Sequence, residues 1–166
     1  MKFIVTFVGI FSCIFLNAQT DSIAPPPYKR FPTVPPFRLL MPDSSTYFTK
    51  ADIPKKTPVL ILAFSPDCDH CQKEITELIQ NIGKFKKIQI VMATWQSFAD
   101  MRKFYVDYKL YQYENIRVGR DVSFILPPFY NIRNLPFLAL YDKKGNLITV
   151  GEGSLPMTKV LEHFEQ

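Results

Sequence analysis

The chain has 166 residues, 47% of them hydrophobic and 21% charged, a balance that suits one folded domain and excludes disorder along the whole length. Its formal charge of +5 is modest and its basic residues are scattered, so the sequence does not indicate a nucleic-acid-binding protein. Three cysteines are too few for a disulfide-stapled small protein. No apolar run reaches the roughly 18–20 residues of a membrane-spanning helix, which excludes a polytopic membrane protein.

The first 18 residues have the pattern of an export signal. The positive Lys2 precedes an almost unbroken apolar run, Phe3–Leu16, and the segment ends on the small residue Ala18. We therefore predict a cleavable signal peptide at residues 1–18, with an uncleaved membrane anchor or a lipid on Cys13 as alternatives. Export would place the protein in the periplasm or cell envelope, an oxidising compartment.

Prolines are concentrated shortly after this signal. Residues 24–36 hold six of the 14 prolines of the chain. Because proline lacks a backbone N–H and fixes its φ angle, such a stretch favours an extended polyproline conformation and disfavours a helix. We therefore predict a linker at residues 19–34, followed by one folded domain at residues 35–166.

The first part of this domain combines a hairpin with alternating strands and helices. Apolar residues around the turn signal Pro42-Asp43-Ser44 predict a hairpin, Phe37–Leu40 with Thr46–Phe48. Continuous apolar runs predict two buried strands, Val59–Phe64 and Ile88–Ala93. Apolar residues at helical spacing predict two helices, one with Ile75, Leu78, Ile79 and Ile82 that ends at Gly83, the other with Phe98, Met101, Tyr105 and Tyr108.

The second part of the domain continues this alternation and ends in another hairpin. The predicted elements are a short strand at Asn115–Val118, a helix at Asp121–Leu126 stopped by Pro127-Pro128, a hairpin of Phe137–Tyr141 with Leu147–Val150, and a helix with Met157, Val160, Leu161 and Phe164 that has Ser154 near its N-cap. Strands joined by helices form a mostly parallel sheet, and the second hairpin adds an antiparallel edge. The sequence therefore predicts an α/β fold, a three-layer α/β/α sandwich with a mixed central sheet.

A pair of cysteines lies where the first buried strand leads into a helix. The segment is Ser65-Pro66-Asp67-Cys68-Asp69-His70-Cys71, and its two cysteines are the only ones outside the export signal. Cys68 is expected at the helix N-terminus, where unpaired N–H groups and the helix dipole favour a thiolate. Cys71 follows one turn later, within reach of a disulfide. This arrangement predicts a redox-active pair that carries out thiol–disulfide exchange.

The two residues between the cysteines are expected to tune the pair in opposite directions. A protonated His70 stabilises the Cys68 thiolate and makes the disulfide more oxidising, whereas Asp69 has the opposite effect. A zinc site needs about four ligands, and beyond the cysteines the chain offers only His70 and the distant His163. A purely structural disulfide would close a very small loop and stabilise little. We therefore predict redox chemistry, with no metal and no cofactor.

The segment SPDCDHC, preceded by VLILAF, resembles the active-site segment of the thioredoxin superfamily, and its exported TlpA-like branch, related to the peroxiredoxins, is the nearest match. The hairpin that begins at Phe37 resembles the N-terminal extension of that branch, and Asn134–Asn146 resembles its proline-containing segment. The resemblance implies a thioredoxin-like fold with Pro136 as the cis-proline that faces the cysteines. Leu135 and Pro136 would then bind an extended segment of the substrate as an added strand.

Two departures from the family pattern concern proton transfer and the loop before Cys68. Many thioredoxins carry a buried acid six residues before the first cysteine, where this chain has Leu62. Water, Asp67 and Glu74 are alternative acceptors for the proton of Cys71. The aromatic residue that usually precedes the first cysteine is replaced by Ser65-Pro66-Asp67.

The leading interpretation is an exported thiol–disulfide oxidoreductase that acts on protein thiols and disulfides. The CxHC pattern favours an oxidant or isomerase, whereas the TlpA-like resemblance favours a reductant supplied by a membrane electron donor. One alternative is a thiol peroxidase, for which Ser65 matches the hydroxyl position but Ile61 replaces the expected proline. The other is a thioredoxin-fold binding module without catalysis.

Overall fold

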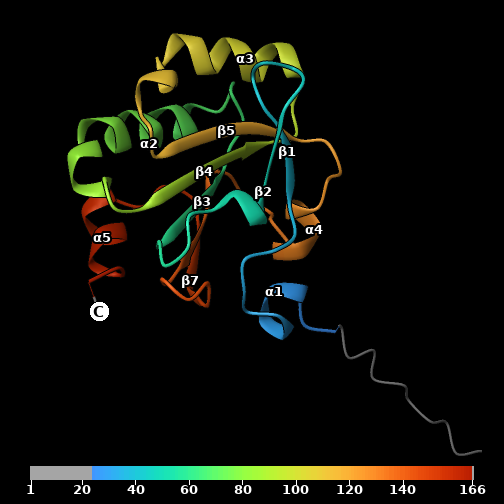
Figure 1. The fold of residues 1–166 in the computed structure, drawn as a ribbon, viewed down its shortest axis with the longest axis vertical. Coiled ribbons are helices and arrows are strands. Elements are labelled where there is room, and N and C mark those ends of the chain that lie inside the picture. Colours follow the sequence, from blue (N-terminus) through green and yellow to red (C-terminus); the bar gives the residue numbers. More distant parts are fainter. Residues whose placement is uncertain (1–23, 166) are drawn as a thin grey trace, which may run out of the picture.

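The computed structural model describes residues 24–165, and within them seven strands form one mixed sheet in the order β2-β1-β5-β4-β3-β6-β7 (Figure 1). β3, β4 and β5 are parallel to one another, and the remaining strands pair antiparallel with their neighbours. The strands are β1 Arg38–Leu40, β2 Tyr47–Thr49, β3 Val59–Ala63, β4 Gln89–Thr94, β5 Ile116–Asp121, β6 Phe137–Tyr141 and β7 Leu147–Glu152.

Helices cover both faces of the sheet, which makes the three layers that the sequence predicts. The helices are α1 Pro27–Arg30, α2 Asp69–Gln80, α3 Phe98–Asp107, α4 Leu126–Tyr130 and α5 Met157–Glu162. Buried residues of α2, α3 and α5 share one hydrophobic cluster with the sheet, and those of α4 share a second cluster on its other side, against which Tyr28 of α1 packs. Within residues 24–165, no helix is both long and apolar enough to cross a membrane.

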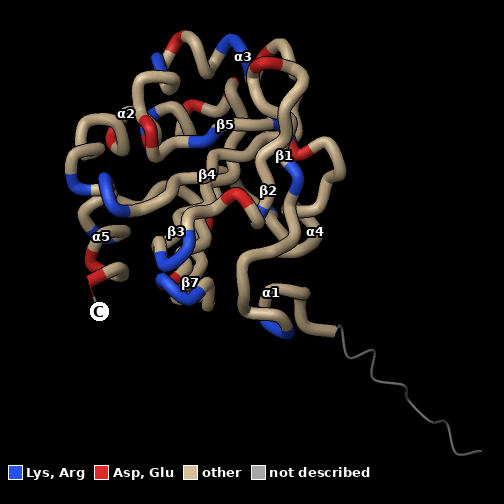
Figure 2. Tube along the Cα trace, viewed as in Figure 1, with Lys and Arg blue, Asp and Glu red and all other residues tan. Residues whose placement is uncertain are grey.

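The central strand β3 shows why its sequence is a continuous apolar run. Leu60 and Leu62 point into the cluster beneath α2 and α3, while Val59, Ile61 and Ala63 point into the cluster beneath α4. Every residue of the strand is therefore buried, on both faces of the sheet. The loop that carries the cysteines begins directly after this rigid strand. Lys and Arg residues are spread over many elements around this core (Figure 2).

The predicted helix at Asp121–Leu126 is wrong. Asp121 is the last residue of β5, which is a full six-residue strand rather than the short one expected. The helix begins only at Leu126 and contains Pro127 and Pro128 in its first turn. Proline is tolerated there because the first N–H groups of a helix have no partner within it, so these prolines start the helix instead of stopping it.

Three other local predictions also differ from the structure. α2 ends at Gln80 with Asn81 as its C-cap, and Gly83 lies inside a following 3-10 turn instead of ending the helix. The N-cap of α5 is Pro156, so Ser154 does not cap it. The single-turn α1 shows that the proline-rich segment is not extended throughout; it begins with Pro27, where proline fits a helical turn.

The predicted export signal at residues 1–18, with Cys13, lies outside the described residues. The end of the predicted linker, in contrast, contacts the domain. Thr33 forms a β-bridge with Asn146, and Val34 is buried in the cluster beneath α4. The boundary between residues 34 and 35 stays a prediction, and packing is continuous across it.

Candidate redox site

Cys68 is the N-cap of α2, and its backbone is held in place by the loop that leaves β3. The residue is extended (φ −87°, ψ 114°), and its Sγ accepts a hydrogen bond from the Cys71 N–H at 3.3 Å. Its backbone N–H donates to the Ser65 carbonyl at 3.2 Å, and its carbonyl accepts from the Gln72 N–H at 3.0 Å. The sulfur therefore occupies the position of a helix-capping oxygen, where backbone N–H groups favour negative charge.

The two cysteines are free thiols with different exposure. Cys68 is half-buried, whereas Cys71 is fully buried in the cluster beneath α2 and α3. Burial is the largest cause that raises the pKa of Cys71, to about 12, and the neighbouring Cys68 and Glu74 add to the effect. Cys68 is thus the accessible sulfur, and Cys71 is held as a thiol behind it.

Leu135 and Pro136 lie opposite the cysteines, as the family resemblance predicts. The Leu135–Pro136 peptide bond is cis, and the Leu135 carbonyl oxygen lies 4.0 Å from Cys68 Sγ. Strand β7 supports this loop. Glu152 accepts hydrogen bonds from Arg133 N–H at 3.3 Å and from Asn134 Nδ2 at 3.1 Å, and the Pro136 carbonyl accepts from the Gly153 N–H at 2.8 Å. This role of Glu152 has no local signal in the sequence, because the contact joins the two ends of a hairpin.

Glu74 is a buried carboxylic acid one turn after Cys71. Only 2% of the residue is exposed. Burial raises its pKa from 4.5 to about 7, although the Leu155 N–H, which lies 3.2 Å from both carboxylate oxygens, lowers it. Glu74 follows Cys71 by three residues on α2, so the two side chains lie on the same face of the helix.

The other acid considered from the sequence, Asp67, has a different environment. Asp67 is exposed, and it accepts a hydrogen bond from the buried Ser65 hydroxyl, which lowers its pKa below 3.8. Leu62, at the position of the acid found in many thioredoxins, is fully buried in the core. Of the two candidate acids, Glu74 is therefore the buried one on the same helix as Cys71, and Asp67 is the exposed one.

The residues between the cysteines face the solvent. Asp69 and His70 are both exposed in the first turn of α2, and the carbonyl of His70 accepts a hydrogen bond from the Ser154 hydroxyl at 3.5 Å. Gln72, which the sequence reasoning missed, donates from Nε2 to the Pro66 carbonyl at 2.8 Å and so ties α2 to the loop before Cys68. In residues 24–165 no group of three or more His, Cys, Asp or Glu side chains is placed to hold a metal ion.

No protein-family model and no curated protein matches this sequence. Solved structures do match the fold. A secreted disulfide oxidoreductase of Mycobacterium tuberculosis, homologous to E. coli DsbE, has a TM-score of 0.63 at 18% identity over 76% of this chain and 92% of its own. A putative thiol:disulfide interchange protein DsbE of Chlorobium tepidum has a TM-score of 0.63 at 21% identity, and the match covers 78% of this chain and 90% of that protein. A putative thioredoxin of Neisseria meningitidis has a TM-score of 0.63 at 20% identity, and the match covers 77% of this chain and 84% of that protein.

The chain therefore has a thioredoxin-like fold that is structurally close to DsbE-like disulfide oxidoreductases at low sequence identity. Its cysteine pair, Cys68 and Cys71, lies at the start of α2 with the two sulfur-bearing residues next to one another.

Proposed function

We propose that the protein is an exported thiol–disulfide oxidoreductase that exchanges disulfides with protein partners through Cys68 and Cys71. The observation that carries this proposal is the geometry of Cys68, whose half-buried sulfur caps α2 and faces the Leu135 carbonyl at 4.0 Å. An accessible sulfur at a helix N-terminus, backed by a buried thiol one turn away, has the arrangement that two-step exchange requires.

In the reducing direction, the Cys68 thiolate attacks one sulfur of a partner disulfide. A mixed disulfide forms, the partner's S–S bond breaks, and its second sulfur leaves as a thiolate that takes a proton from water. Cys71 then loses its proton and attacks Cys68 Sγ, which releases the partner's first sulfur as a thiolate. The partner has gained two electrons, and Cys68 and Cys71 have become a disulfide. In the oxidising direction the same steps run backwards.

The second step needs a proton acceptor, because burial raises the pKa of Cys71 to about 12. We assign this role to Glu74. With a pKa of about 7, its carboxylate is half-ionised near neutral pH and can take the proton of the adjacent thiol. Asp67 is less suited, since its lowered pKa makes it a weak base.

Leu135 and Pro136 are assigned to substrate binding. The carbonyl of Leu135 lies beside Cys68, so a partner segment that crosses the sulfur can pair with this backbone as an added strand. Backbone pairing does not depend on the partner's side chains, and it would therefore serve several protein thiols or disulfides.

His70 and Asp69 are assigned to tuning the reduction potential, and that potential decides the direction of exchange. A value near about −180 mV or higher means that His70 dominates and the protein donates or shuffles disulfides. A value near about −270 mV means a reductase, which needs an electron donor such as a membrane partner in an oxidising compartment. Equilibration of the full-length chain with glutathione measures the potential directly.

Trapping of covalent partners tests the proposal. The Cys71→Ser variant of the full-length chain lacks the resolving thiol, so mixed disulfides on Cys68 should accumulate and appear as reductant-sensitive bands on non-reducing gels. The matched Cys68→Ser variant removes the half-buried, accessible thiol and should trap little, because Cys71 is fully buried. Equal trapping by both variants, or by neither, would contradict the proposal. Failure to trap, together with a pair that does not cycle in glutathione, would leave the binding module; rapid peroxide turnover would indicate the peroxidase.

A further inference from the structure

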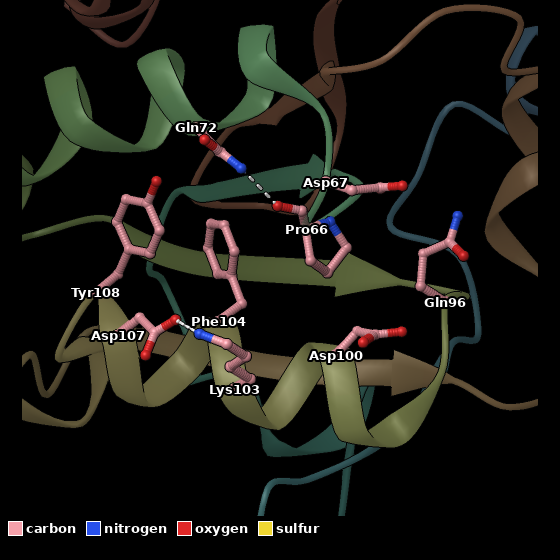
Figure 3. A pocket seen from close by; sticks show the side chains of 9 residues that line it. All are labelled: Pro66, Asp67, Gln72, Gln96, Asp100, Lys103, Phe104, Asp107 and Tyr108. Atoms are coloured by element: carbon pink, nitrogen blue, oxygen red, sulfur yellow. Dashed lines mark hydrogen bonds and ion pairs between the residues drawn. The ribbon is translucent and has the colours of Figure 1, made fainter.

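A groove of about 500 Å³ lies between α3 and the start of α2 with the loop that precedes it (Figure 3). Pro66 and Asp67 line it from the loop that precedes Cys68, and Gln72 lines it from the residue after Cys71. These residues flank Cys68 and Cys71 in the sequence, although neither cysteine lines the groove. Residues that neighbour a partner's reactive sulfur are therefore within reach of the groove.

One wall of the groove is aromatic. Phe104 reaches from α3 toward Pro66, with Tyr108 beside it (Figure 3). The Phe104 and Tyr108 rings are stacked, with centroids 4.2 Å apart and an interplanar angle of 18°. Phe104 is only 4% exposed and also packs against Phe64, so the half-buried Tyr108 is the ring that is open to a partner. Such a ring attracts cations, arginine above all, through its ring electrons.

The charges around the groove are mostly negative. Three aspartates against one lysine give its lining a formal charge of −2, on a chain whose total is +5. The lysine, Lys103, is paired with Asp107 one turn further along α3. The carboxylates of Asp67 and Asp100 lie at the opposite end, beside Gln96 (Figure 3).

Both of these carboxylates are held in position by hydroxyl groups. Ser65 donates to Asp67, and this hydrogen bond is the largest cause that keeps the pKa of Asp67 below its usual value. Ser97 donates to Asp100, while the Asp100 N–H donates back to the Ser97 hydroxyl at 3.1 Å. Within residues 24–165, neither the Asp67 nor the Asp100 carboxylate forms a salt bridge. The groove thus combines the half-buried Tyr108 ring with two carboxylates that form no ion pair within the described residues.

We infer that this groove binds an arginine or lysine side chain of the protein partner, in the segment that flanks the partner's reactive cysteine. Because the inference rests on the proposed exchange activity, it names a substrate class for that activity: basic protein segments. A guanidinium is planar, lies flat on aromatic rings and pairs with carboxylates, so arginine fits the groove better than lysine. The replacement of the usual aromatic residue before the first cysteine by Asp67 then has a role in specificity.

The test compares peptide disulfides that differ only in charge. Each substrate is a disulfide-linked dimer of a short single-cysteine peptide with a self-quenching fluorophore. Arginine, norleucine or glutamate is placed in turn at each of the positions within four residues of the cysteine. With the reduced full-length chain, the best arginine position should give a rate constant about three- to tenfold above norleucine, and glutamate should be slower than norleucine. The preference should shrink as salt screens the carboxylates.

Variants of Asp100 show whether the groove is responsible. Asp100→Asn keeps an oxygen for the Ser97 hydroxyl and should lower the arginine-to-norleucine ratio about two- to threefold. Asp100→Lys should reverse the order and favour the glutamate peptide. Asp52→Asn is the matched control, since Asp52 also accepts a hydroxyl hydrogen bond at the start of a helical turn but does not line the groove.

The outcomes separate this inference from the proposed function. Equal rates for the three peptides at every position, or an arginine preference that survives Asp100→Lys, would overturn the basic-segment inference while the exchange activity stands. No exchange with any peptide would overturn the proposed function, and the inference with it. A loss of preference in Asp52→Asn as large as in Asp100→Asn would assign the effect to overall charge instead of the groove.

Discussion

Replacement of the buried Glu74 by glutamine should change how the stability of the protein depends on pH. The folded state holds this carboxyl at a pKa of about 7, against 4.5 when it is exposed. Between those two pH values the folded state binds more protons than the unfolded state, so the free energy of unfolding falls as the pH rises. The stability that depends on a protonated Glu74 is fully present below pH 4.5 and has been lost above pH 7.

The size of this effect follows from the shift of the pKa. A shift from 4.5 to about 7, at 1.36 kcal/mol for each unit, corresponds to about 3 kcal/mol. Glu74→Gln has no charge to bury, and its amide oxygen can still accept the hydrogen bond from the Leu155 N–H. The free energy of unfolding of the variant, measured relative to the wild type, should therefore rise by about 3 kcal/mol when the pH is raised from 4.5 to 8.

Urea unfolding of the full-length chain at the two pH values, with a phosphine reductant to keep Cys68 and Cys71 as thiols, measures this gain. Glu77→Gln is the control, because Glu77 lies on the same helix and accepts a hydrogen bond from the Met157 N–H at 2.8 Å. If the stability difference between Glu74→Gln and the wild type is the same at pH 4.5 and pH 8, the pKa of Glu74 is not raised by burial. That result would also refute the assignment of Glu74 as the proton acceptor of the resolving thiol.

Three further predictions concern the cysteines and the core. Brief treatment of the reduced full-length chain with iodoacetamide near pH 7.5 should label Cys68 and spare the buried Cys71, as read by peptide mass spectrometry; equal labelling would contradict the assigned roles. Gly119→Ala should lower the free energy of unfolding in urea by about 1–3 kcal/mol, because the new Cβ would lie 2.7 Å from a side chain of β1; an unchanged value would show that β1 can move away. Tyr141→Phe should cost about 1–3 kcal/mol in the same assay, since it leaves the buried Tyr130 hydroxyl without its partner; replacing both tyrosines by phenylalanine should cost less than the sum of the single changes.

The central sheet was predictable because its strands follow a simple rule. β3 and β4 are parallel strands buried on both faces, and such strands give continuous apolar runs that no exposed element shows. α4 was not predictable in the same way. Pro127 and Pro128 are compatible with the end of one helix or with the first turn of the next, and only the capping of the Leu126 N–H by Asp121, at 2.8 Å, places them at a beginning.

The residues of the candidate site likewise fall into those that the sequence predicts and those that it does not. Cys68 and Cys71 are local in sequence, so their spacing and their position after a strand identified them. The contact of Cys68 with Leu135 spans 67 residues and came from the family resemblance alone. Glu74 looks in the sequence like any charged residue of a helix, and its burial depends on the packing of α5 against α2. The groove between α2 and α3 has no local sequence signal, because its walls come from separate helices.

The proline-rich segment also protects the outer edge of the sheet. β7 is an edge strand, and the start of its free side is covered by this segment: Leu147 N–H donates to the Pro32 carbonyl at 2.8 Å, and Val34 N–H donates to the Gly145 carbonyl at 3.2 Å. Proline can accept such hydrogen bonds but cannot donate them, so the contact stays a single bridge, Thr33 with Asn146, and does not grow into an eighth strand. Unprotected edges template edge-to-edge association between molecules. The segment therefore occupies the first part of the edge where a second chain would add, and its own prolines end the ladder there.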